Sequence, residues 1–218
     1  MGFDKLFAPL AGKPVVWHSL KAFSDCSEVD EIIVVAKEDR IKEFEELLRT
    51  ETLSKARKIV AGGAERHLSV WNGLQAVSSK KSEFVAIHDG ARPLTTPKLI
   101  HACLQMAEEF GAACCASPIP DTVKRVSIEQ MVQENVERAG LWAMQTPQVF
   151  SSGLILQAYA SLMAKHEMVT DEVSAVQKLG KKIALLKNED WNFKVTYPHD
   201  LELAEQVLNL RAKKKPRS

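Results

Sequence analysis

The fold of this protein is indicated most clearly by the stretch Phe84-Val85-Ala86-Ile87-His88-Asp89-Gly90-Ala91-Arg92-Pro93, in which a short apolar run ends in an acid, a glycine, an arginine and a proline. An apolar run of this length between turn residues predicts a strand that is buried on both faces. In open α/β sheets, ligands bind just beyond the carboxyl ends of such strands. We therefore expect Asp89 and Arg92 to lie at the rim of a ligand site.

The residue types at this strand end suit a phosphorylated substrate. A carboxylate and a guanidinium a few residues apart can hold a cation and an anionic group together, as a phosphate that travels with Mg²⁺ requires. The alternative is a strand-end salt bridge followed by a turn proline. Asp89 and Arg92 fit both interpretations, so the choice depends on the rest of the chain.

Apolar runs alternate with helical patterns along the sequence. Strands are predicted over 31–36, 58–61, 84–88, 112–116, 182–186 and 193–195. Helices are predicted from Pro14 to Leu20 and over 39–48, 66–77, 97–110, 153–164, 171–179 and 198–210. This order implies right-handed crossovers, so we expect an α/β fold with a mainly parallel sheet and helices on both faces.

The alternation stops between Ser117 and about Gly140. Pro118, Pro120 and the polar stretch 127–137 do not favour a helix packed on the sheet, whereas 122–126 alternates like an exposed strand. We interpret 117–140 as a β-arm that leaves a single domain spanning 1–218. The arm is either a loop or, because projecting strands need a pairing partner, a dimerisation element.

Composition excludes several classes of protein. The chain has 218 residues, enough for a sizeable core, and a formal net charge of +1 with Lys and Arg dispersed, so no nucleic-acid partner is expected. The basic tail 211–217 is expected to be a frayed, solvated end. No apolar run approaches the roughly 20 residues of a membrane span, and no secretory pattern is present. We expect a soluble, cytoplasmic protein that does not bind membranes.

The cysteines and histidines do not indicate a metal centre. The four cysteines are Cys26, Cys103, Cys114 and Cys115, and no pair has C-x-x-C spacing. The adjacent Cys114 and Cys115 lie in an apolar run, which predicts buried free thiols and a reducing compartment. The six histidines lack ligand spacing, so no zinc site is expected.

Two further segments are candidates for ligand binding, and each has a simpler alternative. Gly62 and Gly63 precede a helix whose first turn carries Arg66 and Ser69 on one face; they form either a phosphate- or base-contacting loop or an ordinary turn. Lys194, on a short apolar strand, points either to solvent or over phosphates.

Two other segments carry weaker signals. Thr146 offers a hydroxyl at a turn fixed by Pro147, which alone indicates little. Lys5 lies in a loop that leads into the Pro14 helix with no strand before it, and we therefore expect a segment upstream.

Taken together and in this order, these segments resemble the 2-C-methyl-D-erythritol 4-phosphate cytidylyltransferase family. The similarity extends over essentially the whole chain. The matching pieces are Lys5, Leu10-x-Gly12-Lys13-Pro14, His18-Ser19-Leu20, Gly62-Gly63-x-x-Arg66-x-x-Ser69-Val70-x-x-Gly73-Leu74, His88-Asp89-Gly90-Ala91-Arg92-Pro93, Asp121-Thr122-x-Lys124, Arg138-x-x-Leu141-Trp142, Thr146-Pro147-Gln148, Thr170-Asp171-Glu172 and Lys194-Val195-Thr196-x-Pro198-x-Asp200-Leu201.

The resemblance implies a Rossmann-like nucleotidyltransferase fold and a step in isoprenoid precursor biosynthesis by the non-mevalonate route. It implies that a phosphate oxygen of 2-C-methyl-D-erythritol 4-phosphate attacks the α-phosphorus of CTP, with Mg²⁺ as cofactor, and that pyrophosphate leaves. No covalent enzyme intermediate is required, so the protein aligns the reactants and offsets developing charge. This accounts for candidate residues that are lysines, arginines and hydroxyls.

The same resemblance implies a role for each matching residue. The residues implied in catalysis are Lys5, Arg138 and Lys194. Those implied in the cytosine and ribose pocket are Gly62, Gly63 and Ser69, with the Gly90 backbone beside them. Those implied in the polyol phosphate site are Asp89, Arg92 and Thr146, and Asp89 also lies near the Mg²⁺–CTP complex. Thr122 and Arg138 fall in the arm, which in the family crosses a homodimer to complete the partner's substrate site.

The sequence departs from the family pattern in two ways. The family opens with a strand and a glycine-rich loop that wraps the CTP phosphates, and Met1-Gly2 correspond to the end of that loop; we therefore expect an internal start or a shortened chain rather than a natural loss. If the chain starts naturally at Met1, weak CTP binding is expected. Ala64 replaces a frequent acid and Gly90 a frequent alanine, which bears on base selectivity.

Two alternative functions stay open at this point. One is a ribitol 5-phosphate cytidylyltransferase, which would share fold and chemistry. The other is a catalytically impaired dimeric binding protein, because of the missing phosphate loop.

Overall fold

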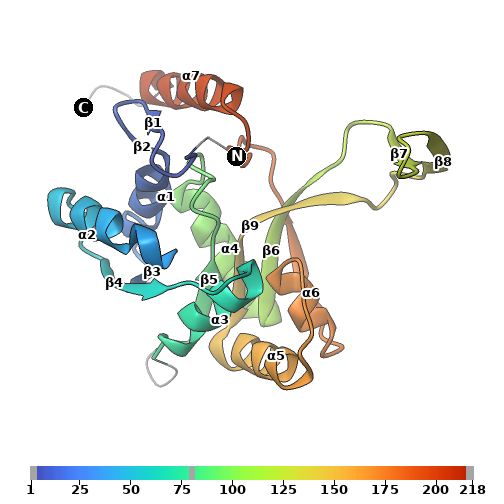
Figure 1. Cartoon of the computed structure of the whole chain (residues 1–218), viewed down its shortest axis with the longest axis horizontal. Coiled ribbons are helices and arrows are strands. Elements are labelled where there is room, and N and C mark those ends of the chain that lie inside the picture. Colours follow the sequence, from blue (N-terminus) through green and yellow to red (C-terminus); the bar gives the residue numbers. More distant parts are fainter. Residues whose placement is uncertain (1–3, 79–81, 215–218) are drawn as a thin grey trace.

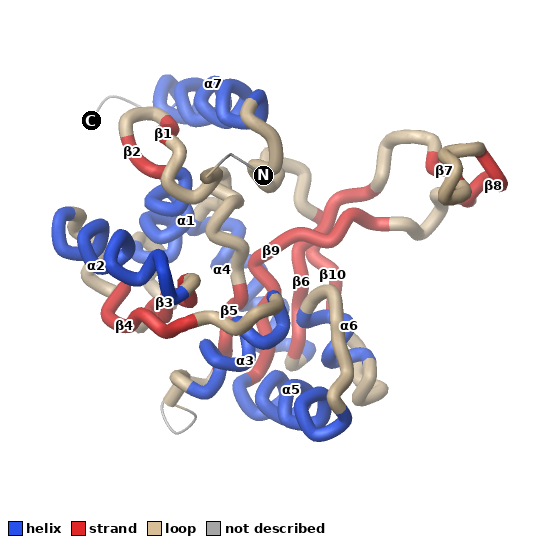
Figure 2. Tube along the Cα trace, in the orientation of Figure 1, coloured by secondary structure: helices blue, strands red, loops and turns tan. Residues whose placement is uncertain are grey.

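The computed structural model describes residues 4–78 and 82–214, and its centre is a four-stranded sheet (Figures 1 and 2). The sheet has the order β10-β6-β9-β5. Its strands are β5 (Phe84–Ile87), β6 (Ala112–Pro118), β9 (Trp142–Ser151) and β10 (Ala184–Lys187). β6 and β10 are parallel, whereas β9 runs antiparallel to both of its neighbours, β6 and β5.

The sheet is therefore mixed, and the prediction of a mainly parallel sheet was wrong in this respect. Its cause is β9, a strand of 10 residues in a segment where the sequence predicted only a proline-fixed turn. Pro147 lacks an N–H group and so does not favour a central strand. Here it lies where the β6–β9 pairing shifts register, between the Cys114–Gln148 and Ala116–Met144 pairs, and such an irregularity tolerates proline.

Helices cover both faces of this sheet, as predicted. Helix α4 (Pro97–Phe110) packs with Ala113 and Cys115 of β6 on one face. Helices α5 (Ser152–Lys165) and α6 (Glu172–Gln177) pack with Ala112 and Cys114 on the other. All four of these β6 side chains are completely buried, because successive residues of a strand point to opposite faces and both faces are covered. The prediction of buried free thiols is confirmed for Cys114 and Cys115, and Cys26 and Cys103 are also free and buried.

A second, smaller layer precedes the four-stranded sheet in the chain. Strands β3 (Ile32–Ala36) and β4 (Ala56–Ala61) form a parallel pair. The helical elements around it are α1 (Val15–Ser24), η1 (Glu38–Arg40), α2 (Ile41–Thr50) and α3 (Arg66–Gln75). Phe44 and Leu47 of α2 pack into a core with Val34 of β3. The short strands β1 (Pro9–Leu10) and β2 (Lys13–Pro14) lie next to α7 (His199–Lys214) in Figure 1.

The segment 117–140 leaves the body as an arm, as predicted (Figure 1). Its tip is an antiparallel pair, β7 (Val123–Val126) and β8 (Val132–Val136). Apolar side chains of the tip are exposed, Ile128 at 94% and Met131 at 68%. β8 lies in the polar stretch 127–137, where the sequence predicted no strand because Gln133, Glu134 and Asn135 interrupt the alternation.

Two smaller predictions were wrong. Residues 193–195 form no strand; one backbone hydrogen bond, from Val195 N–H to the Ala91 carbonyl (2.8 Å), connects them to the loop after β5. Arg211, expected in a solvated tail, belongs to α7 and donates to the Leu94 carbonyl (2.6 Å) and Asp190 (2.9 Å). Residues 215–218 of the tail lie outside the described residues. No helix in the described part of the chain is long and apolar enough to cross a membrane.

Candidate functional site

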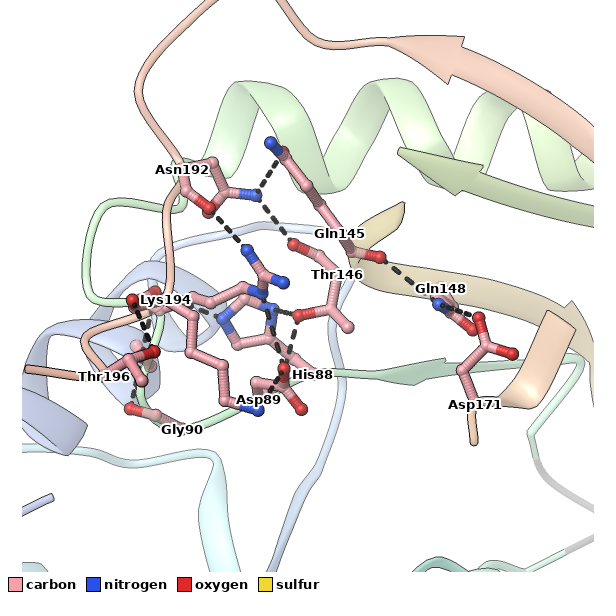
Figure 3. A network of polar contacts seen from close by, with 12 residues as sticks. His88, Asp89, Gly90, Gln145, Thr146, Gln148, Asp171, Asn192, Lys194 and Thr196 are labelled. Carbon is pink, nitrogen blue, oxygen red and sulfur yellow. Dashed lines mark hydrogen bonds and ion pairs between the residues drawn. The ribbon is translucent and has the colours of Figure 1, made fainter. Parts of the chain in front are cut away.

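Asp89 is the centre of a charged cluster beyond the carboxyl end of β5 (Figure 3). Its carboxylate contacts the Lys194 ammonium at 3.0 Å and the Arg92 and Arg66 guanidinium groups at 3.4 Å each. Arg92 follows Asp89 in the same loop, Arg66 opens α3, and Lys194 precedes α7. Three segments that are distant in sequence thus bring cations to one acid at the edge where α/β sheets bind ligands.

These cations control the charge of the site. Burial would raise the pKa of Asp89, but the positive charges of Lys194, Arg66 and Arg92 outweigh it and hold the pKa at about 2. Asp89 is therefore ionised at neutral pH. Arg66 has a second carboxylate partner in Glu172, so the cluster holds two acids and three cations and retains positive charge that attracts anionic groups. The strand-end salt bridge between Asp89 and Arg92 exists, but as one part of this larger cationic site.

Thr146 and His88 fix the backbone of the Asp89 loop. The Asp89 N–H donates to Thr146 Oγ1 (3.0 Å), and the Thr146 hydroxyl donates to His88 Nδ1 (2.9 Å). His88 Nε2 in turn donates to the Arg92 carbonyl (3.3 Å); acceptance at Nδ1 together with donation at Nε2 is the hydrogen-bond pattern of the neutral imidazole. Burial lowers the pKa of His88 to about 4, so the ring is neutral at physiological pH. Thr146 therefore contributes to the site by fixing the backbone of the Asp89 loop.

A second hydrogen-bond network holds the segment that carries Lys194. The Asn192 side-chain amide donates to the Thr146 carbonyl (2.8 Å), and the Arg92 guanidinium donates to the Asn192 carbonyl (2.8 Å). Figure 3 shows Asn192 and Lys194 on one segment that folds over the Asp89 loop. The Lys194 side chain is 39% exposed, so it lies at the rim rather than in bulk solvent. The alternative of a lysine that simply faces away from the fold is wrong.

The Gly62–Gly63 loop has no room for side chains. A Cβ atom on Gly63 would lie 2.4 Å from the Leu68 Cβ, and one on Gly62 would lie 2.9 Å from Ser69 Oγ. The Gly63 N–H donates to Ser69 Oγ at 3.1 Å. Ser69 therefore holds the two glycines against the start of α3. Because glycine has no side chain, a flat or anionic ligand can approach the backbone of this loop closely.

Lys5 lies in a half-buried loop before β1 that is tied to Arg40. Asp4 accepts a hydrogen bond from Arg40 at 2.5 Å, and the Arg40 guanidinium stacks over the Phe7 ring, 4.7 Å from its centroid. The hydrogen bond from Arg40 lowers the pKa of Asp4, and this effect outweighs the opposing one of burial. Asp4 and Phe7, on either side of Lys5, are thus both held by Arg40 at the junction of η1 and α2.

The remaining predicted residues lie further from the cluster or act through the backbone. The Gly90 carbonyl accepts from the Ser19 hydroxyl at 3.1 Å, and a Cβ on Gly90 would lie 3.2 Å from Val16. Thr122 and Arg138 are exposed on the arm, and Arg138 donates to the Pro120 carbonyl. Within one chain the arm projects away from the body of the fold (Figure 1).

Sequence reasoning missed three residues at the site. Glu172 is completely buried and pairs with Arg66, 106 residues away. Tyr159 donates to Glu172 (3.2 Å), and Asn192 supports Thr146. Arg66 and Glu172 stood in quoted motifs, but no local pattern shows that they meet. A lone acid within the otherwise apolar face of a short helix was the one available signal.

Among the described residues, no group of three or more His, Cys, Asp or Glu side chains could hold a metal ion. Asp89 itself is engaged by three cations. The cluster therefore offers a divalent cation one carboxylate at its centre, and a Mg²⁺ ion here would need phosphate oxygens as its other ligands. Mg²⁺ is commonly bound in that way.

Comparisons with known proteins agree on one family. The family model described as 2-C-methyl-D-erythritol 4-phosphate cytidylyltransferase matches residues 1–210. A protein of that name from Bacillus mycoides is 41% identical over 212 residues, covering 97% of this chain and 92% of its own. The protein of the same name from Halalkalibacterium halodurans is 42% identical over 207 residues, covering 95% and 90%.

Solved structures show the same similarity. The 2-C-methyl-D-erythritol 4-phosphate cytidylyltransferase of Thermus thermophilus superposes with a TM-score of 0.80 at 31% identity, covering 94% of each chain. The 4-diphosphocytidyl-2C-methyl-D-erythritol synthase of Anaerococcus prevotii superposes with a TM-score of 0.83 at 28% identity, covering 94% of this chain and 93% of its own.

Proposed function

This chain belongs to the 2-C-methyl-D-erythritol 4-phosphate cytidylyltransferase family, and from that premise we propose how its residues carry out the transfer. The protein is a cytidylyltransferase of isoprenoid precursor biosynthesis. It joins the cytidylyl group of CTP to 2-C-methyl-D-erythritol 4-phosphate and releases pyrophosphate. A phosphate oxygen of the polyol attacks the α-phosphorus of CTP as the bond to the β-phosphate oxygen breaks.

We assign the reaction to the Asp89 cluster because the Asp89 carboxylate contacts three cations. Two phosphorylated reactants repel each other, and a site that unites them must supply fixed positive charge. Lys194, Arg92 and Arg66 supply it from separate elements. The carboxylate of Asp89 keeps their side chains together when no phosphate is bound, so the site is preorganised rather than assembled on binding.

Each reactant has its own part of the site. The polyol phosphate binds against Asp89, Arg92 and Lys194, with Thr146 maintaining the loop. The cytidine moiety lies along the backbone of Gly62, Gly63 and Gly90. Lys5 contacts the CTP phosphates from the N-terminal loop, where it offsets charge that develops on the leaving pyrophosphate.

Mg²⁺ accompanies CTP in this proposal, with Asp89 as the protein's carboxylate ligand and phosphate oxygens as the others. When bound, the ion neutralises phosphate charge during the transfer. The three cations keep Asp89 ionised at neutral pH, so its carboxylate has the negative charge that a Mg²⁺ ligand requires; the ion would share the two oxygens with the cations that contact them.

The arm completes the site of a second copy of the chain. The support is its projection from the body and the exposed apolar residues of its tip, Val126 at 54%, Ile128 at 94% and Val132 at 68%. A two-stranded ribbon with such a surface is not stable alone in water and gains from pairing. In the homodimer, Thr122 and Arg138 reach the polyol phosphate site of the partner.

The activity is tested by pyrophosphate release from the protein, with CTP, Mg²⁺ and one polyol phosphate at a time. We expect turnover with methylerythritol 4-phosphate and much less with ribitol 5-phosphate. Equal or greater turnover with ribitol 5-phosphate would shift the assignment to that substrate. Absence of pyrophosphate with both would overturn the enzyme assignment.

The dimer is tested by mixing two inactive variants, Lys194→Ala and Arg138→Ala. In a mixed dimer, one site combines an intact body with an intact arm, so random reassociation restores about a quarter of the wild-type activity. Sedimentation of each variant alone provides the control for dimer formation. Mixed samples that stay inactive, although subunits exchange, would show that the arm does not serve the partner's site.

A further inference from the structure

We propose that Glu172 is a positioning residue that fixes the Arg66 guanidinium beside Asp89, so that Arg66 binds a phosphate group of a substrate. The inference rests on the proposed function, because it assigns two more residues to the same site. Glu172 itself is buried and does not touch the reactants.

The pair has the geometry of a clamp on a guanidinium group. Arg66 Nη1 donates to Glu172 Oε1 at 2.5 Å, and Nη2 donates to Oε2 at 3.0 Å. Such paired contacts fix the plane of the guanidinium as well as its position. The Glu172 side chain is completely buried, whereas Arg66 is 37% exposed. One side of the guanidinium is thus held in the protein, and the other is open to a ligand.

The support behind Glu172 is rigid. Asp171 caps α6 by accepting from the Ser174 N–H (2.9 Å), and the adjacent backbone amide, of Val173, donates to the buried side chain of Gln148 in β9 (3.1 Å). The Tyr159 hydroxyl of α5 donates to Glu172 Oε1 (3.2 Å). The carboxylate is therefore fixed from α5, α6 and β9, and it transfers that rigidity to a side chain of α3.

The two acids hold Arg66 unequally. Its contact with Asp89 is 3.4 Å, longer than the 2.7–2.9 Å typical of charge-assisted hydrogen bonds, whereas its contacts with Glu172 are close to or shorter than that range. Burial would lower the pKa of Arg66, but the hydrogen bonds and charge of Glu172 raise it above its ordinary value, so the cation is permanent. Arg66 is therefore fixed by Glu172 and only weakly occupied by Asp89, which leaves N–H groups for a phosphate.

The competing explanation is a structural ion pair that only joins α3 to α6. The two explanations differ in what they predict for substrate binding. A purely structural pair affects the amount of folded protein but not the Michaelis constant. A clamp on a phosphate-binding arginine raises the Michaelis constant for one phosphorylated substrate, either CTP or the polyol phosphate. Separate titration of each substrate identifies which phosphate Arg66 contacts.

The test uses Glu172→Gln and Arg66→Lys, alone and together, in the full protein. Glu172→Gln keeps the size of the side chain, and its amide oxygen can still accept from Tyr159; Arg66 reaches solvent, so this variant buries no unpaired charge. Arg66→Lys keeps the charge but loses the two-pronged contact. Val173→Ala, at the adjacent buried residue of α6, is the control for a loss of packing.

We expect both single variants to raise the KM for the same substrate by about tenfold, with a smaller change in kcat, and the double variant to show little further loss because the two residues act as a unit. Val173→Ala should lower the melting temperature without changing either KM. An unchanged KM in both single variants, with melting temperatures lowered, would overturn the proposal. Wild-type protein without pyrophosphate release would instead contradict the proposed function itself.

Discussion

The sharpest prediction concerns Lys194→Ala, which should impair turnover far more than stability. The ammonium group lies 3.0 Å from Asp89, but its side chain is 39% exposed, so solvent screens the ion pair. Screened pairs of this kind contribute roughly 0.2–1 kcal/mol. Arg66 and Arg92 remain beside Asp89 after the substitution, so no unpaired buried charge results. We therefore expect a stability loss of less than about 1 kcal/mol, or a melting temperature lowered by about 2–4 °C.

The effect on the reaction should be much larger. Removal of one preorganised donor from a site that stabilises a developing charge typically costs about 100- to 1,000-fold in rate, or roughly 3–4 kcal/mol. The assay is pyrophosphate release under saturating CTP, with the melting temperature measured on the same samples. Lys187→Ala is the matched control, because this lysine forms an exposed ion pair with Glu189 (2.6 Å) outside the cluster.

The activities of the two lysine variants together test the role of Lys194. Lys187→Ala should retain nearly full activity. If Lys194→Ala kept more than about a third of the wild-type rate, or if it lost stability as severely as activity, Lys194 would be a structural residue and the cationic site would need another explanation.

Two further predictions follow from the surroundings of the site. Arg40→Ala should lower kcat/KM by about tenfold with a stability loss of about 1 kcal/mol, because it removes the contacts that hold Asp4 and Phe7 on either side of Lys5. The control is Arg49→Ala, which removes a side chain that is 72% exposed beside Glu46. Equal activities of the two variants would argue against an anchored Lys5. The neutral form of His88 should make stability fall as pH decreases from about 6.5 to about 4, by up to roughly 3 kcal/mol, because the unfolded chain binds the proton that the folded chain excludes. Urea unfolding of His88→Gln should show a flatter pH dependence in that window, with the exposed His199→Gln as control, and an unchanged slope would refute the assignment.

Much of the fold could be predicted because its periodic elements are locally encoded. Helix α4 was predicted over its observed bounds, with a proline at its start and Gly111 in the left-handed conformation after its end. β6 was recognised as an apolar run with both faces buried. These signals depend on neighbours within a few residues, which a sequence displays directly.

β9 was missed because its evidence is not local. Its central residues Gln145, Thr146 and Pro147 favour a turn when considered alone, and only the pairing with β5 and β6 makes them a strand. Because β9 was not predicted, the sequence did not indicate that the sheet is mixed. Tertiary contacts override local preference at such positions.

The same distinction applies to the site. Asp89 and Arg92 could be predicted together because one strand end carries both. Lys194 and Arg66 could be named as candidates, but they reach Asp89 from segments that lie 105 and 23 residues away in sequence. Glu172, the buried partner of Arg66, is 106 residues away from it, and this pairing is visible only in the folded chain.

The central claim is that a phosphate oxygen of the polyol attacks the α-phosphorus of CTP, and isotope labelling tests it most directly. The polyol phosphate is labelled with ¹⁸O in its phosphate oxygens, and the products are analysed by ³¹P NMR, in which ¹⁸O shifts the signal of the bonded phosphorus. We expect ¹⁸O to bridge the two phosphorus atoms of the product and to be absent from pyrophosphate. Label in pyrophosphate, or a bridge between the two phosphorus atoms that contains no ¹⁸O, would contradict this attack.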